Sequence, residues 1–334
     1  MVEHVKFPSI GKFKDAVKEM NWLFKYPESK PLCKFTGTVK LHGTHADICR
    51  NFKNEEEHIW FQSRNRILSI GKYDNYGFKE WMSTRSLAFL DSFPRTSTLL
   101  VAGEFCGKNI QQTVAIEGLP YFYVIFGIKV DETWLRLDEI SHIHDNSSNI
   151  YNIAQFPTFT MDIDFNCPRN AENALREITN KVEAECPVGK FFGVSGIGEG
   201  VVWHMIAMKE SENEDEQEWI PTNPQVFFKV KGELHDVTVT KHIASAETEE
   251  VKDVDEFIKN VLTEQRLNQG IQYLKEMNIS SIRPFLKWVA QDVFKEENDT
   301  ITANGLNEKA LAKKLSVEAR KWFASNKNTA KSYA

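Results

Sequence analysis

The spacing of hydrophobic residues changes twice along the chain. Residues 1–30 have an amphipathic helical pattern. Between about residues 32 and 130 this gives way to short runs of β-branched and aromatic residues separated by Gly, Asn, Asp and Ser, which predicts β-strands. Beyond about residue 245 apolar residues again recur at helical spacing. The apolar face of the first helix is formed by Phe13, Val17, Met20 and Leu23.

The middle of the chain contains both kinds of pattern. Helices are predicted over residues 76–90 and 170–184, and strands over 200–204 and 225–230. This mixture of strands and helices, with no internal repeat, is typical of an α+β domain.

The C-terminal region is predicted to be helical throughout. Its apolar residues form three stretches, around Phe257, from Pro284 onward and around Leu315, and a proline suits the first turn of a helix. We therefore expect an α+β domain over residues 1–243, followed by a small all-α domain over residues 244–334.

Composition indicates a folded protein without a membrane segment. Of the 334 residues, 41% are hydrophobic, which is enough for sizeable cores. No stretch reaches the roughly 18 consecutive apolar residues of a membrane span, and the N-terminus has no apolar signal core. The five cysteines show no Cys-x-x-Cys spacing, so neither a disulfide framework nor a structural zinc is expected. We expect a soluble intracellular protein, cytoplasmic if it comes from a phage or bacterium.

The net charge of −6 does not by itself indicate a nucleic-acid-binding protein. Its distribution is more informative, because the last 34 residues carry a charge of +5 and the preceding 300 a charge of −11. Six acidic residues fall within 209–218, a run that is typical of a solvated loop. A basic tail can contact phosphates, so we expect the C-terminal domain to engage a nucleic acid.

Common nucleotide-binding and metal-binding motifs are absent. The phosphate-loop pattern does not occur, because every Gly-Lys pair is followed by Phe, Tyr or Asn. The glycine-rich stretch 193–200 does not fit Gly-x-Gly-x-x-Gly. His142 and His144 have no further ligands in evidence, so we interpret them as part of a polar loop. If a nucleotide binds, another arrangement must hold it.

The segment Lys40-Leu41-His42-Gly43-Thr44 offers such an arrangement. A lysine attacks phosphorus only as the neutral amine, a form that a nearby cation or a desolvated setting favours. Gly43 would let the backbone approach a nucleotide closely, and Thr44 offers a hydroxyl group. On its own, the segment is better explained as an ordinary lysine at the end of a strand, beside a turn.

Four further segments follow Lys40 in a fixed order. They are Gly103-Glu104-Phe105, the aromatic run 121–128, Glu199-Gly200-Val201-Val202 and Lys229-Val230-Lys231. Together, the five segments resemble the motifs of the covalent nucleotidyltransferases, the superfamily of DNA ligases, RNA ligases and mRNA-capping guanylyltransferases. His42 followed by Gly-Thr is similar to the RNA ligase 2 family, which includes phage enzymes and trypanosome editing ligases.

The resemblance implies an ATP-grasp-like nucleotidyltransferase domain with mixed and antiparallel sheets, acting as an ATP-dependent RNA ligase. Lys40 would take AMP from ATP as lysyl-AMP and pass it to an RNA 5′-phosphate, and a 3′-hydroxyl would then displace the AMP. The implied substrates are nicks in duplex RNA or RNA/DNA hybrids. We expect a monomer without membrane attachment.

The resemblance also implies roles for the residues of the phosphate site. Lys229 and Lys231 alternate on one strand face and would neutralise the α-phosphate beside Lys40. Glu199 would help to hold Mg²⁺ or Mn²⁺, which suits a site of carboxylate and phosphate oxygens. His42 would contact phosphate or organise the pocket.

Other residues would bind the rest of the nucleotide. Glu104 and Arg64 would contact the ribose, with Arg66 as the alternative arginine, and Phe126 would stack on adenine. Gly43 and Thr44 would line the pocket beside His42.

Two positions depart from the family pattern. Many members carry Glu directly before the lysine, where this chain has Val39, and Asp after the aromatic residue, where it has Gly127. Two alternatives stay open: a DNA ligase or mRNA-capping guanylyltransferase, and a non-catalytic nucleic-acid-binding relative. The first two usually append a β-rich OB-fold, whereas the C-terminal region here has a helical pattern.

Overall fold

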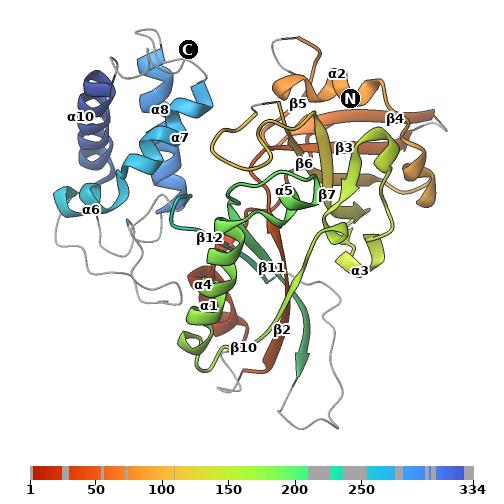
Figure 1. Cartoon of the computed structure of the whole chain (residues 1–334), viewed down its shortest axis with the longest axis horizontal. Coiled ribbons are helices and arrows are strands. Elements are labelled where there is room, and N and C mark those ends of the chain that lie inside the picture. The colour runs from red at the N-terminus through yellow and green to blue at the C-terminus, as the bar shows by residue number, and fades with distance from the viewer. Residues whose placement is uncertain are drawn as a thin grey trace. The chain divides into compact units, whose positions relative to one another are not determined.

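The computed structural model describes residues 3–24, 30–53, 56–71, 74–108, 110–209, 226–235, 254–274, 281–297, 301 and 306–326. The chain divides into two compact units, Met1–Gly232 and Glu233–Ala334. Figure 1 shows the strands of the first and the helices of the second. The predicted domain boundary at 243/244 and the acidic residues 210–218 lie outside the described residues. None of the described helices is long and apolar enough to cross a membrane.

The first sheet of the N-terminal unit has five strands in the order β1-β12-β11-β2-β10. Neighbouring strands are antiparallel, except that β1 and β12 run parallel. The strands predicted over 200–204 and 225–230 are confirmed as β11 and β12. The bounds are β1 Gly11–Lys12, β2 Leu32–Lys40, β10 Phe159–Asp164, β11 Gly200–Lys209 and β12 Phe227–Lys231.

Side chains of this sheet alternate between a buried face and an open face, because successive residues of a strand point to opposite sides. On β2, Phe35 and Val39 are buried, whereas Lys34 and Lys40 are partly exposed. On β12 the buried Phe228 alternates with two partly exposed lysines. The polar residues of three neighbouring strands thus share the open face, as expected for an antiparallel sheet that is covered on one side.

Helices α1 (Phe13–Leu23) and α4 (Arg169–Ala184) pack on the buried face. The ring of Phe13 lies 4.8 Å from that of Phe228. The helix predicted over 170–184 is confirmed as α4. The helix predicted within 1–30 begins only at Phe13, because residues 3–10 form neither helix nor strand and contain Pro8, and the residue before a proline avoids the helical region.

The second sheet follows the order β5-β4-β3-β6-β7-β8, and β9 pairs in parallel with β7. The structure thus confirms the predicted α+β class with mixed and antiparallel sheets. The bounds are β3 Thr44–Lys53, β4 Glu56–Ser63, β5 Arg66–Ile67, β6 Leu99–Cys106, β7 Phe122–Val130, β8 Thr133–Trp134 and β9 Ile150–Asn152.

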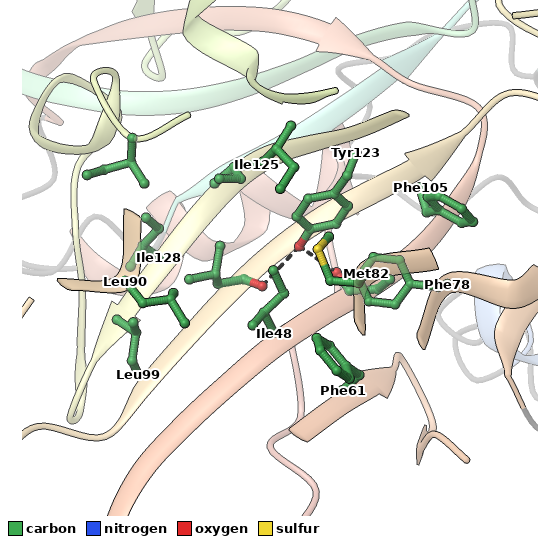
Figure 2. Close-up of a cluster of buried hydrophobic side chains, with 14 of the residues drawn as sticks. Ile48, Phe61, Phe78, Met82, Leu90, Leu99, Phe105, Tyr123, Ile125 and Ile128 are labelled. Carbon is green, nitrogen blue, oxygen red and sulfur yellow. Dashed lines mark hydrogen bonds between the residues drawn. The ribbon is translucent and has the colours of Figure 1, made fainter. Parts of the chain in front are cut away.

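A cluster of buried aromatic and aliphatic side chains covers one face of the second sheet (Figure 2). The Tyr123 hydroxyl lies 2.9 Å from the backbone oxygen of Ala46 and 3.1 Å from that of Val101, so it donates its proton to one of them. Gly103 leaves room for this ring, because a Cβ there would lie 2.3 Å from it. The phenol therefore fastens β7 to β3 and β6 inside an apolar core.

The helix predicted over 76–90 is wrong in extent. The structure has a short helix α2 (Phe78–Ser83) and a separate 3₁₀ turn η2 (Ala88–Ser92). The fully buried Arg50 guanidinium donates to the backbone oxygens of Leu90, Phe93 and Pro94, which fastens the end of η2 and the residues after it to the sheet. The other short elements are η1 Asn75–Gly77, α3 Leu137–Ile140, η3 Asn146–Ser148, η4 Ile153–Gln155 and α5 Pro187–Phe191.

The C-terminal unit is built from helices, and its described residues contain no strand. The three predicted helical stretches correspond to α6, α8 and α10, and α7 was not predicted. Their apolar faces meet in a core that includes Phe257, Phe285 and Phe323. The bounds are α6 Val254–Val261, α7 Glu264–Leu274, α8 Ile282–Glu296 and α10 Glu308–Asn326.

Candidate active site

Three neighbouring strands bring Lys40, Glu199 and Lys231 together on the first sheet. Lys40 is the last residue of β2, Lys231 is the last residue of β12, and Gly200 begins the strand β11 between them. Gly200 pairs in register with Lys40 on one side and with Lys231 on the other. It has a φ of +149°, and a Cβ there would lie 2.2 Å from the backbone oxygen of Val230, so this position requires glycine.

The Glu199 carboxylate lies between two lysines and a histidine. Its Oε2 atom is 2.6 Å from Lys40 Nζ and 3.2 Å from His42 Nδ1, and its Oε1 atom is 3.0 Å from Lys231 Nζ. The side chain of Glu199 is only 2% exposed, whereas those of Lys40 and Lys231 are 21% and 23% exposed. A buried anion is thus compensated by cations that keep contact with solvent.

Electrostatics keep Glu199 ionised. Burial by itself raises the pKa of this carboxyl, but the charges of Lys40 and Lys231 and the contact with His42 outweigh burial and hold the pKa well below its usual value. The Lys40 ammonium is therefore held by a permanent carboxylate. An ion-paired ammonium is not a nucleophile, so covalent chemistry at Lys40 requires this pair to open first.

Glu104 supports the turn that follows Lys40. Its Oε1 atom accepts a hydrogen bond of 3.0 Å from the backbone N–H of Gly43. A Cβ at Gly43 would lie 2.4 Å from the backbone oxygen of Phe105, so only glycine allows this turn to lie against β6. Burial raises the pKa of Glu104, an effect that the charges of Lys40 and His45 partly offset.

The remaining predicted site residues surround this turn. The Thr44 hydroxyl is 3.1 Å from Asn75 Oδ1. Phe126, on β7, is partly exposed and its ring centroid lies 5.7 Å from that of His45. Arg64 lies in the turn between β4 and β5, where it donates to the Ser9 hydroxyl at 3.3 Å.

Two predicted residues remain, the alternative arginine Arg66 and the first lysine of the last motif, Lys229. Arg66, in β5, is exposed. Lys229 lies on the open face two residues before Lys231, and its strand is interior, because β12 pairs with both β1 and β11. The structure therefore joins Lys40, His42, Glu199 and Lys231 by direct contacts, and Glu104 contacts the turn that follows Lys40.

Several polar residues near the turn were not predicted. His45 Nε2 lies 2.7 Å from Oδ1 of the fully buried Asp47, and Gln62 donates to the other oxygen of Asp47 at 2.9 Å. Gln111 donates to the backbone oxygen of Gly43 at 3.3 Å. The sequence does contain a signal for the His45–Asp47 pair: the two residues are separated by one position in a strand-like run, so their side chains share a face.

An aromatic side chain from the N-terminal segment also lies at the site. The ring centroid of Phe7 is 5.4 Å from that of Phe126, 5.0 Å from His45 and 5.1 Å from Trp134. Two hydrogen bonds between the Val5 backbone and the Gln62 amide fasten this segment to the second sheet. Phe7 therefore holds Phe126 from the side, in an edge-to-face arrangement that aromatic pairs prefer.

A metal ion at this site would need ligands besides the protein's own carboxylates. Among the described residues there is no group of three or more His, Cys, Asp and Glu side chains that could hold a metal ion. Mg²⁺ is commonly bound by one or two carboxylates together with phosphate oxygens and waters. Glu199 fits such a site only if a bound nucleotide supplies the phosphate oxygens.

The chain was compared with known proteins. Solved structures that align with it include a variant of Naegleria gruberi RNA ligase with AMP and Mn, at 17% identity and a TM-score of 0.42, covering 68% of this chain and 56% of that chain. A variant of the same ligase with ATP and Mn aligns at 17% identity and a TM-score of 0.43, with the same coverage. The ligase with PPi aligns at 18% identity and a TM-score of 0.40, covering 65% and 56%.

The chain thus spans just over half the length of these ligases. No curated protein matches it. The RNA ligase family model, however, matches residues 34–231, which is more than half of the chain and includes all the lysines and carboxylates of the candidate site. The chain belongs to the RNA ligase family.

Proposed function

We propose that this protein is an ATP-dependent RNA ligase with Lys40 as its nucleophile. The observation that carries the proposal is the contact of Lys40 and Lys231 with one buried carboxylate, Glu199, inside the region that matches the family. The Lys40 nitrogen would attack the α-phosphorus of ATP, forming an N–P bond while the bond to pyrophosphate breaks. AMP would then pass to an RNA 5′-phosphate, and attack by a 3′-hydroxyl would release it.

Opening of the ion pair is the first requirement of this reaction. Lys40 attacks as the neutral amine, so its nitrogen must leave the contact with Glu199 before it can reach the phosphorus. An α-phosphate placed beside Lys229 and Lys231 would draw Lys231 from the carboxylate. Glu199 would hold Mg²⁺ or Mn²⁺, which would supply positive charge to the phosphates.

The remaining contacts would orient the nucleotide. Phe126, held by Phe7, would stack on adenine, whereas Glu104 and Arg64 would lie beside the ribose. His42, Gly43 and Thr44 would line the turn that faces the phosphates. Such positioning and charge neutralisation account for most of the catalysis in phosphoryl transfer.

The first test is adduct formation with radiolabelled ATP. We expect a labelled protein that survives denaturation, no label from GTP, and loss of the label in Lys40→Ala. Lys34→Ala is the matched control, because Lys34 lies on the same strand and the same face, six residues or roughly 20 Å away. An adduct that persists in Lys40→Ala would refute the nucleophile, and an adduct with GTP would favour a capping enzyme.

The finer proposal concerns the RNA substrate, for which we propose nicks in duplex RNA or in RNA/DNA hybrids. The test is a panel of matched substrates: nicked duplex RNA, nicked hybrid, nicked DNA and single-stranded RNA ends. We expect sealing of the first two at the highest rate. Equal or faster joining of single-stranded ends would contradict the nick proposal and leave the adenylation chemistry intact.

A further inference from the structure

We propose that Lys12 binds the β- and γ-phosphates of the nucleoside triphosphate, the pyrophosphate that leaves when Lys40 attacks. The inference deepens the proposed function and rests on it. Lys12 lies in the short edge strand β1, outside the region 34–231 that matches the family.

The backbone register directs Lys12 to the open face. Strand β1 pairs in parallel with β12, placing Gly11 opposite Phe228 and Lys12 opposite Lys229. Side chains paired in this way point to the same side of a sheet. Phe228 points to the buried face, which α1 covers. Gly11 faces the same side, because a Cβ there would lie 2.9 Å from Asp15 of α1. The next residue, Lys12, therefore points to the face of Lys229.

The order of the strands places Lys12 on the side opposite the nucleophile. Crossing the open face from β2 to β11, β12 and β1, one meets Lys40, then Lys229 and Lys231, and finally Lys12. Strands β2 and β1 are three strand spacings apart, or roughly 14 Å. In an in-line displacement, the leaving group departs on the side of the phosphorus that faces away from the nucleophile. With the α-phosphate beside Lys229 and Lys231, the pyrophosphate would extend towards β1.

The charge of Lys12 also favours departure of the pyrophosphate towards β1. Lys12 and Lys229 are in register on neighbouring strands, so an anion that lies along the open face there would meet both side chains. As the N–P bond to Lys40 forms, the electron pair of the breaking P–O bond moves to the pyrophosphate oxygen. A lysine neutralises phosphate charge effectively, so Lys12 would stabilise the charge that develops on this leaving group.

The test compares Lys12→Met, which removes the charge, with Lys12→Arg, which retains it. Lys6→Met is the matched control, because Lys6 is an exposed lysine of the same N-terminal segment. Three quantities would be measured: kcat/KM for lysyl-AMP formation, the rate at which pyrophosphate reverses the adduct, and the sealing of RNA that is already adenylated. Thermal unfolding confirms that each variant folds.

We expect Lys12→Met to lose about tenfold in both pyrophosphate-dependent rates, the loss that about 1.4 kcal/mol of binding represents. Lys12→Arg should recover most of this loss, and sealing of pre-adenylated RNA should stay within about twofold of wild type. Wild-type rates of adduct formation and reversal in Lys12→Met would overturn the inference. An equal loss in the sealing of pre-adenylated RNA would also overturn it, since Lys12 would then contact RNA.

A binding experiment separates this inference from the proposed function. Titration of the protein with inorganic pyrophosphate needs no covalent step at Lys40. We expect weaker binding to Lys12→Met than to wild type and unchanged binding to Lys6→Met. Failure of the wild type to form an adduct would refute the proposed function, whereas equal pyrophosphate binding by wild type and Lys12→Met would refute the role of Lys12 alone.

Discussion

Substitution of Glu199 by Gln is expected to destabilise the N-terminal unit. The change removes the negative charge that lies between Lys40, His42 and Lys231, at 2.6, 3.2 and 3.0 Å. Breaking a buried ion pair costs about 3–5 kcal/mol, but these lysines keep contact with solvent, so about 1–3 kcal/mol is expected here. For a unit of this size that corresponds to a fall in Tm of roughly 2–12 °C.

The pH dependence of this effect follows from the lowered pKa of Glu199. A carboxylate with a lowered pKa in the folded state contributes stability that is complete above its unfolded pKa, about 4.3 for glutamate. That stability is lost as the pH falls through the folded pKa. The difference between wild type and Glu199→Gln should therefore be present at pH 7 and shrink in acid, below about pH 5.

Urea unfolding of both proteins across this pH range would measure the difference. Glu177→Gln is the control, because it removes an exposed ion pair with Lys181 on the surface of α4, and it should leave stability unchanged. Glu199→Gln should also fail to form lysyl-AMP. Equal stability of Glu199→Gln and wild type at pH 7, or a difference that does not shrink in acid, would refute the electrostatic account.

Three further outcomes are expected. Phe7→Ala should raise the KM for ATP in adduct formation by up to about tenfold, because Phe126 loses its edge-to-face neighbour, and Lys6→Ala should not. Glu104→Gln should lower adduct formation. It should nevertheless melt at or above the wild-type temperature at pH 7, because burial disfavours the ionised carboxyl of the wild type. This gain in melting temperature should vanish as the pH falls through the raised pKa of Glu104. Deletion of residues 244–334 should spare adduct formation with labelled ATP and impair transfer to RNA, more strongly at moderate salt; unchanged sealing would contradict this.

Elements whose packing follows their hydrophobic pattern were predictable from the sequence. Helix α4 and strands β11 and β12 are examples, because their apolar residues face one core. Helix α7 was not predicted, because its buried side includes Arg266 and Gly270 instead of a regular apolar stripe. Arg266 is fully buried and lies 2.8 Å from Asp292, and a Cβ at Gly270 would lie 2.9 Å from the Phe285 ring. Tertiary contacts thus replace the local signal there.

The candidate site was predictable where its residues belong to motifs that occur in a fixed order along the chain, as Lys40, Glu199 and Lys231 do. Phe7 and Gln111 could not be found in this way, because their proximity to the site depends on how separate segments meet. Phe7 belongs to a segment that forms neither helix nor strand and whose apolar residues show no regular spacing. Gln62, on a strand that is distant in the sequence, holds this segment in place. Such contacts are set by sheet order and register, which the pattern of one strand does not specify.

The two departures from the family pattern fit the packing around them. Val39 is 3% exposed on the buried face of β2, where an unpaired carboxylate would be costly. A Cβ at Gly127 would lie 3.3 Å from the Trp134 ring and 3.8 Å from that of Phe7, so these two rings fill the space that an aspartate would need. Under the proposed function, we infer that adenine recognition on this side depends on aromatic packing around Phe126, since the apolar wall leaves no room for a carboxylate.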